Sequence, residues 1–283
     1  MFETMLYGLT IGAVLYLFSI GLSLTFGTMH IINFSHALVY TLGVYFFIGF
    51  RDVLSLGFLP AMLIAVVVML PVAWAIERFV IRRLYGERLD YAIIATYALL
   101  LIGTDIIKIA WGPLPQSINV PLQASIQIAG VNISVYRIVI VICAIVIFLG
   151  LREFFRKTVV GQIVIAALED DEGVRCLGID TSKYFSMVFV MGSALAIVGG
   201  ILYAPISTAE PYMGIHILLL AFSVVIVGGM GSLTGTFYAS FALGMLMALV
   251  GRFWAGGANA SVFLTMALVI IYRHTIQPRL RMR

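Results

Sequence analysis

The chain has 283 residues, of which 62% are hydrophobic and 11% are charged. No soluble domain could bury so much apolar surface, so the composition excludes an ordinary globular protein and predicts an all-α, polytopic transmembrane helical bundle. The formal net charge of +4 does not indicate nucleic-acid binding, because the basic residues lie in short segments between apolar runs, where orientation in a membrane requires them.

Nine apolar runs predict membrane-spanning helices, and we expect about eight to ten spans in all. The runs have roughly 15–22 residues, close to the length that crosses about 30 Å of hydrocarbon. The runs cover 5–26, 34–50, 58–76, 91–110, 135–151, 184–204, 216–233, 236–251 and 259–273. No soluble domain separates them, so we expect residues 1–283 to form a single transmembrane domain.

The distribution of basic residues predicts the orientation of the chain. Basic residues concentrate in three intervals: after the third run, after the fifth run and in the C-terminal tail. Because cytoplasmic loops carry the excess of Lys and Arg, we expect these intervals in the cytoplasm. Nine crossings of a bacterial inner membrane then place the N-terminus outside and the C-terminus in the cytoplasm. The interval 111–134 falls outside.

The most polar interval, residues 152–183, is longer than most connections between spans. It has a basic beginning, a short amphipathic stretch and an acidic cluster from Glu169 to Glu172. A membrane protein gains little from so polar and helical a segment unless another protein docks on it. We therefore predict that this interval is a cytoplasmic surface for a soluble partner.

A polar cluster that includes Asn33 and His36 lies between the first two runs. Polar side chains at the membrane are costly unless they are hydrogen-bonded or wet. The cluster either lines a path through the membrane, or Asn33 or Ser35 caps the start of the second span. A metal site is not expected, because His30 and His36 are six residues apart and no carboxylate is near.

A glycine cluster, Gly228, Gly229, Gly231 and Gly235, joins the seventh and eighth runs. Such a density of glycine either breaks a helix beside a path through the membrane or forms a tight turn with close helix packing. A phosphate-binding loop is excluded, because no Gly-Lys-Ser/Thr sequence follows and the cluster joins two membrane spans.

The remaining polar features have structural explanations. Asp105 and Lys108 are spaced to pair on one helix face, and we expect Glu210 to be solvated at the outer end. The sequence has no nucleophile elbow, zinc-ligand spacing or Walker A loop, so we expect neither an enzyme nor a cofactor or metal. Any energy coupling would then come from another subunit.

Three segments together resemble the permease subunits of ABC importers for branched-chain amino acids, of the LivH type. The first contains Ile32-Asn-Phe-Ser-His36, the second runs from Gly161 to Lys183, and the third runs from Pro211 to Gly235. The resemblance implies packed helices around a central translocation path. It also implies a second permease subunit (a heterodimer is favoured), two cytoplasmic ATPases and a periplasmic solute-binding protein.

The resemblance also implies roles for individual residues. The residues of the loop that would meet the ATPase are Gly161, Ala166, Ala167, Leu177, Gly178 and Ile179. The candidates for the translocation path are Asn33, His36, Leu38, Leu220, Gly228, Gly229 and Gly231.

The chain departs from the family pattern at two positions of the path. Leu38 and Leu220 stand where members commonly carry an acidic residue and a lysine. If both leucines line the path, its wall is apolar, which predicts a solute with substantial apolar surface. The chief alternative function is a stand-alone secondary transporter or channel, and a third is a structural subunit of a larger membrane complex.

Overall fold

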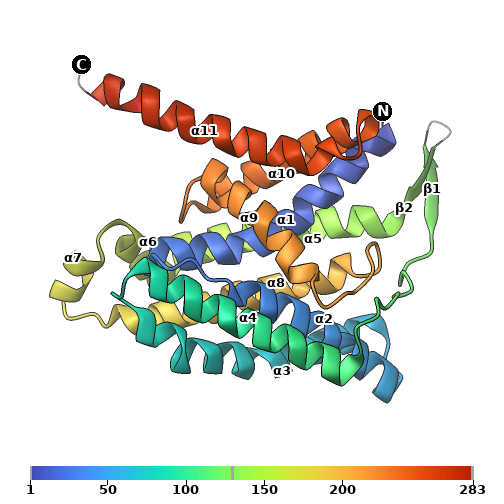
Figure 1. Ribbon diagram of the computed structural model, residues 1–283, viewed down its shortest axis with the longest axis horizontal. Coiled ribbons are helices and arrows are strands. Elements are labelled where there is room, and N and C mark those ends of the chain that lie inside the picture. Colours follow the sequence, from blue (N-terminus) through green and yellow to red (C-terminus); the bar gives the residue numbers. More distant parts are fainter. Residues whose placement is uncertain (1, 129–130, 282–283) are drawn as a thin grey trace.

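The computed structural model describes residues 2–128 and 131–281, which are almost entirely helical (Figure 1). The elements in chain order are α1 (Phe2–Met29), α2 (Ser35–Leu54), α3 (Phe58–Phe79), the 3-10 helix η1 (Ile81–Leu84), α4 (Leu89–Trp111), β1 (Ser125–Ile128), β2 (Val131–Ser134), α5 (Val135–Lys157), α6 (Val159–Glu169), α7 (Asp171–Cys176), α8 (Thr181–Tyr203), α9 (Met213–Gly228), α10 (Leu233–Phe253) and α11 (Gly257–Arg281).

Seven of these helices are long and apolar enough to cross a membrane, namely α1, α2, α3, α4, α5, α8 and α10. The shorter α9 and the apolar part of α11 run between the same two ends of the bundle (Figure 1). Each of the nine expected runs therefore corresponds to a helix, and the polytopic all-α class is confirmed. Helices α6 and α7 lie at one end of the bundle, and the β1–β2 hairpin lies at the other.

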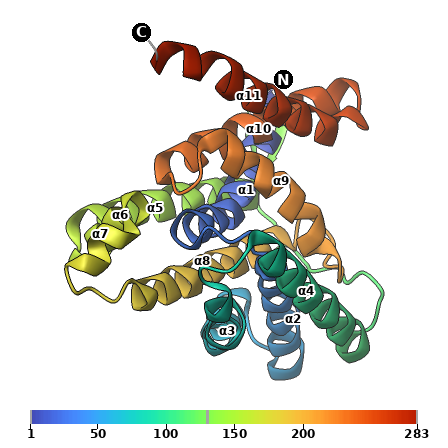
Figure 2. The same cartoon turned by 60° about the vertical axis from the view of Figure 1, so that its left-hand side comes forward.

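Helix α1 is the core of the bundle and lies among α5, α8, α9 and α10 (Figure 2). It is apolar on all sides, and every residue from Ile11 to Thr25 is buried. Glycines bring the backbones close together: a Cβ on Gly21 would lie 2.8 Å from Gly192 Cα in α8. Without a hydrophobic driving force between helices in lipid, such small residues permit the close packing that holds a bundle together.

The peripheral helices expose apolar side chains. Leu63 and Val67 of α3, Ile102 of α4 and Leu268 of α11 are each about 60% exposed. A continuous apolar exterior of this kind fits a lipid bilayer or a second membrane subunit.

Two features differ from what the sequence led us to expect. The run 216–233 does not form one span, because α9 ends at Gly228 and the next glycines, Gly229 and Gly231, have φ angles of +96° and +77°. That backbone conformation favours glycine and stops a helix. The segment between α4 and α5 also contains an unexpected hairpin in which β1 pairs antiparallel with β2. Its strands have four residues each, too few for a clear alternating pattern.

Candidate functional site

Side-chain caps give the charged interval 152–183 its shape. Thr158 Oγ1 accepts the Gly161 N–H at 3.0 Å at the start of α6, and Asp170 Oδ1 accepts the Gly173 N–H at 2.9 Å at the start of α7. Each cap satisfies an N–H group that helix geometry leaves free. The interval is therefore folded into two short helices rather than an open loop.

Gly161 is buried where α6 folds back against α5. A Cβ at this position would overlap Phe155 Cα and lie 2.7 Å from the Phe154 carbonyl oxygen. The close approach that this glycine permits is therefore an approach between α6 and α5 of the same chain.

The other residues expected to meet an ATPase differ in exposure. Ala166, Leu177 and Gly178 are exposed, Leu177 to 79%, and together we call them the coupling surface. Ile179 is half-buried, and Ala167 is buried against the bundle. That a partner docks on the coupling surface stays a prediction.

Leu168 projects from α6 toward two glycines, in a contact that we call the Leu168 contact. A Cβ on Gly27, near the end of α1, would lie 2.7 Å from Leu168 Cδ2 and 2.6 Å from Gly231 Cα. The Gly231 N–H also lies 3.1 Å from both the carbonyl oxygen and the Oγ of Ser23 and donates to them. The contact therefore joins α6 to α1 and to the turn between α9 and α10.

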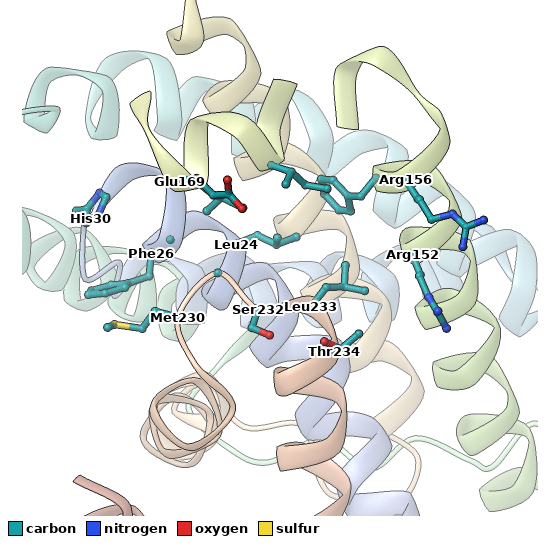
Figure 3. Close-up of a pocket in the computed structure, with 15 residues that line it drawn as sticks. Leu24, Phe26, His30, Arg152, Arg156, Glu169, Met230, Ser232, Leu233 and Thr234 are labelled. Atoms are coloured by element: carbon teal, nitrogen blue, oxygen red, sulfur yellow. The ribbon is translucent and has the colours of Figure 1, made fainter. Parts of the chain in front are cut away.

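A cavity of about 620 Å³, the inner cavity, lies beside the Leu168 contact. It is lined by the end of α1, by α5 and α6, and by the turn from Met230 to Thr234 (Figure 3). Glu169 lies on one side of it and Ser232 and Thr234 on the other, while Arg152 marks the α5 edge. The inner cavity is thus bordered by α6 and by the glycine turn, which also meet directly at the Leu168 contact.

The glycine turn brings the ends of α9 and α10 together. A Cβ on Gly228 would lie 2.6 Å from the Gly235 carbonyl oxygen, and Ser232 Oγ accepts the Gly235 N–H at 3.0 Å. The interpretation of the cluster as a tight turn with close helix packing is confirmed. Gly231 also lines the inner cavity, but the assignment of Gly228, Gly229 and Gly231 to the translocation path stays a prediction.

Asn33 and His36 lie where α2 begins and packs against α1. Asn33 Oδ1 accepts the Ser35 N–H at 3.0 Å and so satisfies an amide at the start of α2, although the N-cap residue itself, Phe34, has no side-chain cap. His36 is fully buried, with its Nε2 3.1 Å from the Phe18 carbonyl oxygen and its ring edge-on to the Phe18 ring. Neither residue lines the inner cavity, and their place on the path stays a prediction.

A second cavity, the outer cavity, has a volume of about 420 Å³ and lies among α1, α2, α8, α9, α10 and α11. Leu220 lines it, whereas Leu38 is buried against Gly103 of α4. The two leucines therefore do not share a cavity. The wall beside Leu220 is not purely apolar either, because Glu210 and His216 line it with Oε1 and Nε2 3.5 Å apart.

Sequence reasoning missed two polar residues of the outer cavity, His216 and Tyr40. His216 follows Glu210 by six residues at the start of an apolar run, which could have been noticed. Tyr40 reaches the cavity through the packing of α2, which no local pattern reveals. The expected pair of Asp105 and Lys108 is confirmed at 2.8 Å. Within residues 2–128 and 131–281, no group of three His, Cys, Asp or Glu residues could hold a metal ion.

The class of the protein follows from this bundle and from its family match. A family model described as the permease component of the branched-chain amino acid transport system matches residues 4–272. The protein is thus a multi-pass membrane permease, a transport component rather than an enzyme. The chain belongs to the family of branched-chain amino acid transport system permease components.

Several curated relatives are similar to the chain over nearly their whole length. The LivH permease protein of the high-affinity branched-chain amino acid transport system of Salmonella typhimurium is 27% identical over 267 residues, covering 87% of this chain and 85% of LivH. BraD of Pseudomonas aeruginosa, also a permease protein of such a system, is 26% identical over 288 residues, covering 96% and 94%. A solved structure, PsaBC from Streptococcus pneumoniae in complex with Fab, aligns with 96% of this chain and 90% of its own at 16% identity and a TM-score of 0.49.

Proposed function

We propose that this chain is the membrane-spanning permease subunit of an ATP-driven importer. Its solute would be an amino acid or a related small carboxylate or amide, delivered by a periplasmic binding protein. The Leu168 contact carries the proposal, because it connects α6 to both α1 and the turn between α9 and α10. A partner that moves α6 can therefore act directly on α1 and on the α9–α10 turn.

The proposed assembly places the chain, as one permease domain, in the bacterial inner membrane. A second and different permease subunit would pair with it, and two cytoplasmic ATPases would supply the hydrolysis that this chain does not perform. The apolar exterior of α3, α4 and α11 supports contact with lipid or with the second permease.

The end that carries α6 and α7 is proposed to face the cytoplasm, with the N-terminus outside and the C-terminus in the cytoplasm. Of the 17 Lys and Arg residues, four belong to the opposite end of the helices, namely Arg51, Lys108, Arg137 and Arg252. The resulting excess at the α6–α7 end agrees with the bias of cytoplasmic loops toward basic residues.

The translocation path is proposed to follow α1. Ile11 and Val14 of this helix line the outer cavity, and Leu24 and Gly27 line the inner cavity. Between the two cavities α1 is buried on all sides, so this conformation is closed. Movement of α6 through Leu168 would shift α1 against its neighbours and open the route, at which point the buried path candidates could meet the solute.

The test compares two glycines in the complete complex, reconstituted in proteoliposomes with its partner subunits and binding protein and supplied with labelled amino acids. Gly161→Ala displaces α6 from Phe155, so ATP-driven uptake should fall while ATP hydrolysis and membrane insertion persist. Gly150→Ala is the matched control on α5, because a Cβ there would meet nothing within 4 Å, and uptake should not change.

Two outcomes would count against the proposal. One is uptake by Gly161→Ala at the wild-type rate per assembled complex, which would remove the coupling role of α6. The other is uptake by the wild-type chain without ATPase subunits, driven by an ion gradient, which would favour the secondary transporter.

A further inference from the structure

The outer cavity has a polar edge that the transport scheme does not yet use. Glu210 and His216 lie there with side chains 38% and 70% exposed, and their Oε1 and Nε2 atoms are 3.5 Å apart. This separation is longer than an ordinary N–H···O hydrogen bond, so the pair is loosely held. Exposed pairs of this kind contribute little stability, and the carboxylate can exchange its partner for another cation.

A hydroxyl group borders the same cavity. Tyr40 lines the cavity from α2, and although the residue as a whole is only 1% exposed, its hydroxyl oxygen is not among the described polar atoms that are sealed in the interior without a hydrogen-bond partner. A hydroxyl group that faces a cavity can exchange water for a polar group of a bound solute. Tyr40 therefore offers a solute a hydrogen-bond acceptor on the α2 side of the cavity.

A positive charge lies next to this edge. A third cavity, of about 470 Å³, adjoins the outer cavity and shares Tyr7 with it. Arg137 lines the third cavity with its guanidinium 5.2 Å from the centre of the Tyr7 ring. Glu3 lines it too, but among the residues described no carboxylate lies within ion-pair distance of Arg137. Arg252 lines the third cavity as well and donates to Thr4 at 3.1 Å, so Arg137 is the guanidinium there that contacts the shared Tyr7.

We propose that Glu210 is the specificity-determining residue of the outer cavity and selects solutes that carry an ammonium group. The ammonium group takes the place of His216 and donates to the Glu210 carboxylate, while the hydroxyl oxygen of Tyr40 accepts a second hydrogen bond from it. Arg137 attracts the negative end of a zwitterionic solute. The volume of the outer cavity, about 420 Å³, lies in the usual range of small-molecule sites.

The apolar side of the cavity defines the rest of the solute. Much of the remaining lining is apolar, including Ile11 and Val14 of α1 and Ile217 and Leu220 of α9. A solute that fits has one ammonium group and a compact apolar body, and an uncharged polyol or an anion without an amine does not. This inference rests on the proposed function, since it assigns a specificity residue to the proposed path.

The experiment measures ATP-driven uptake of labelled L-amino acids by the complete complex in proteoliposomes, with labelled glucose as the uncharged probe. Glu210→Gln should lower amino-acid uptake about tenfold or more, because a hydrogen bond to a charged group is lost. Glu210→Asp keeps the charge and should keep most of the uptake. Asp105→Asn is the control at the same end, since Asp105 pairs with Lys108 and lies outside the outer cavity.

A structural role is separated from a selective one by two further readouts. The amount of assembled complex and its rate of ATP hydrolysis should be the same in Glu210→Gln and in the wild type. Tyr40→Phe, which removes only a hydroxyl, should reduce uptake without altering assembly. If Glu210→Gln assembles poorly, the test rests on the other two variants. The inference then requires that Glu210→Asp keeps most of the uptake and that Tyr40→Phe loses uptake without losing assembly.

Failure of the inference can be told from failure of the proposed function. Wild-type amino-acid uptake that needs ATP but is unchanged in Glu210→Gln and Tyr40→Phe would overturn the inference alone. ATP-driven uptake of glucose but of no amino acid would overturn both the inference and the solute class of the proposed function, leaving only the role as an importer. Absence of any ATP-driven uptake by the wild-type complex would overturn the proposed function first.

Discussion

Replacing Leu168 with alanine should separate ATP hydrolysis from transport. The half-buried Leu168 side chain packs against both Gly27 and Gly231, and alanine would lose this contact. Truncating a fully buried leucine costs about 2–5 kcal/mol, so a half-buried one should cost about 1–2 kcal/mol. For a chain of this size each kcal/mol lowers the midpoint of thermal unfolding by about 2–4 °C, which predicts a fall of about 2–8 °C.

Transport should suffer more than stability. Without the side chain, movement of α6 would no longer press on α1. Uptake per assembled complex should therefore fall by about fivefold or more while ATP hydrolysis continues. A fivefold fall corresponds to about 1 kcal/mol of coupling free energy, which is within the cost estimated for the truncation. The assay is ATP-driven uptake of labelled amino acids by proteoliposomes, beside thermal unfolding in detergent. Leu168→Met, which conserves volume, should retain most of the uptake.

The control for this prediction is another leucine of the same charged interval. Leu177 is 79% exposed, so Leu177→Ala should leave the unfolding midpoint unchanged. Wild-type uptake in Leu168→Ala, or an equal loss of stability in both variants, would refute the reasoning from the Leu168 contact.

Three more predictions follow from single contacts. Gly21→Ala forces α1 away from α8 and should destabilise the bundle by about 1–3 kcal/mol, as overpacking does, measured by thermal unfolding; an unchanged midpoint would refute the close crossing. Tyr85→Phe leaves the fully buried Glu77 without the hydroxyl that lies 2.8 Å from it, which should cost about 1–3 kcal/mol. Burial and this hydrogen bond raise the pKa of Tyr85, so the hydroxyl stays protonated and the loss should be the same at neutral and mildly alkaline pH. A membrane-impermeant maleimide applied to intact inner-membrane vesicles of native sidedness should label a cysteine introduced by Val120→Cys, which is predicted to lie outside, but not the exposed Cys176, which is predicted to lie inside. The reverse labelling pattern would contradict the predicted orientation.

Much of the fold could be predicted because the thickness of a bilayer fixes the length of each apolar run that crosses it. A run of apolar residues of the required length must be helical to satisfy its own backbone in lipid, whatever lies beside it. All nine runs accordingly became helices. The glycine cluster indicated a break or a turn, but the run was extended to residue 233 rather than ended at Gly228, because hydropathy does not register a positive φ angle.

The candidate site was harder to predict because its contacts join residues far apart in the chain. The resemblance pointed to the interval around Gly161, and the structure folds that interval as helices at one end of the bundle. It could not reveal that Leu168 packs against Gly27 and Gly231, or that Tyr40 and Glu210 border one cavity. These relations depend on how α2, α6 and α9 pack around α1, and no local pattern contains that information.

The distribution of glycine along α1 explains how a push at one end can reach the other. A Cβ on Gly8 or Gly12 would meet the backbone of α10 within 3 Å, one on Gly21 would meet α8, and one on Gly27 would meet the α9–α10 turn. Backbones in such close contact have little space for side chains to repack, and packed interfaces of this kind shift between discrete arrangements rather than deforming continuously. A displacement that Leu168 applies near Gly27 would therefore move α1 along most of its length. It would reach the residues of α1 that line the outer cavity, which is what coupling between the two ends of an importer requires.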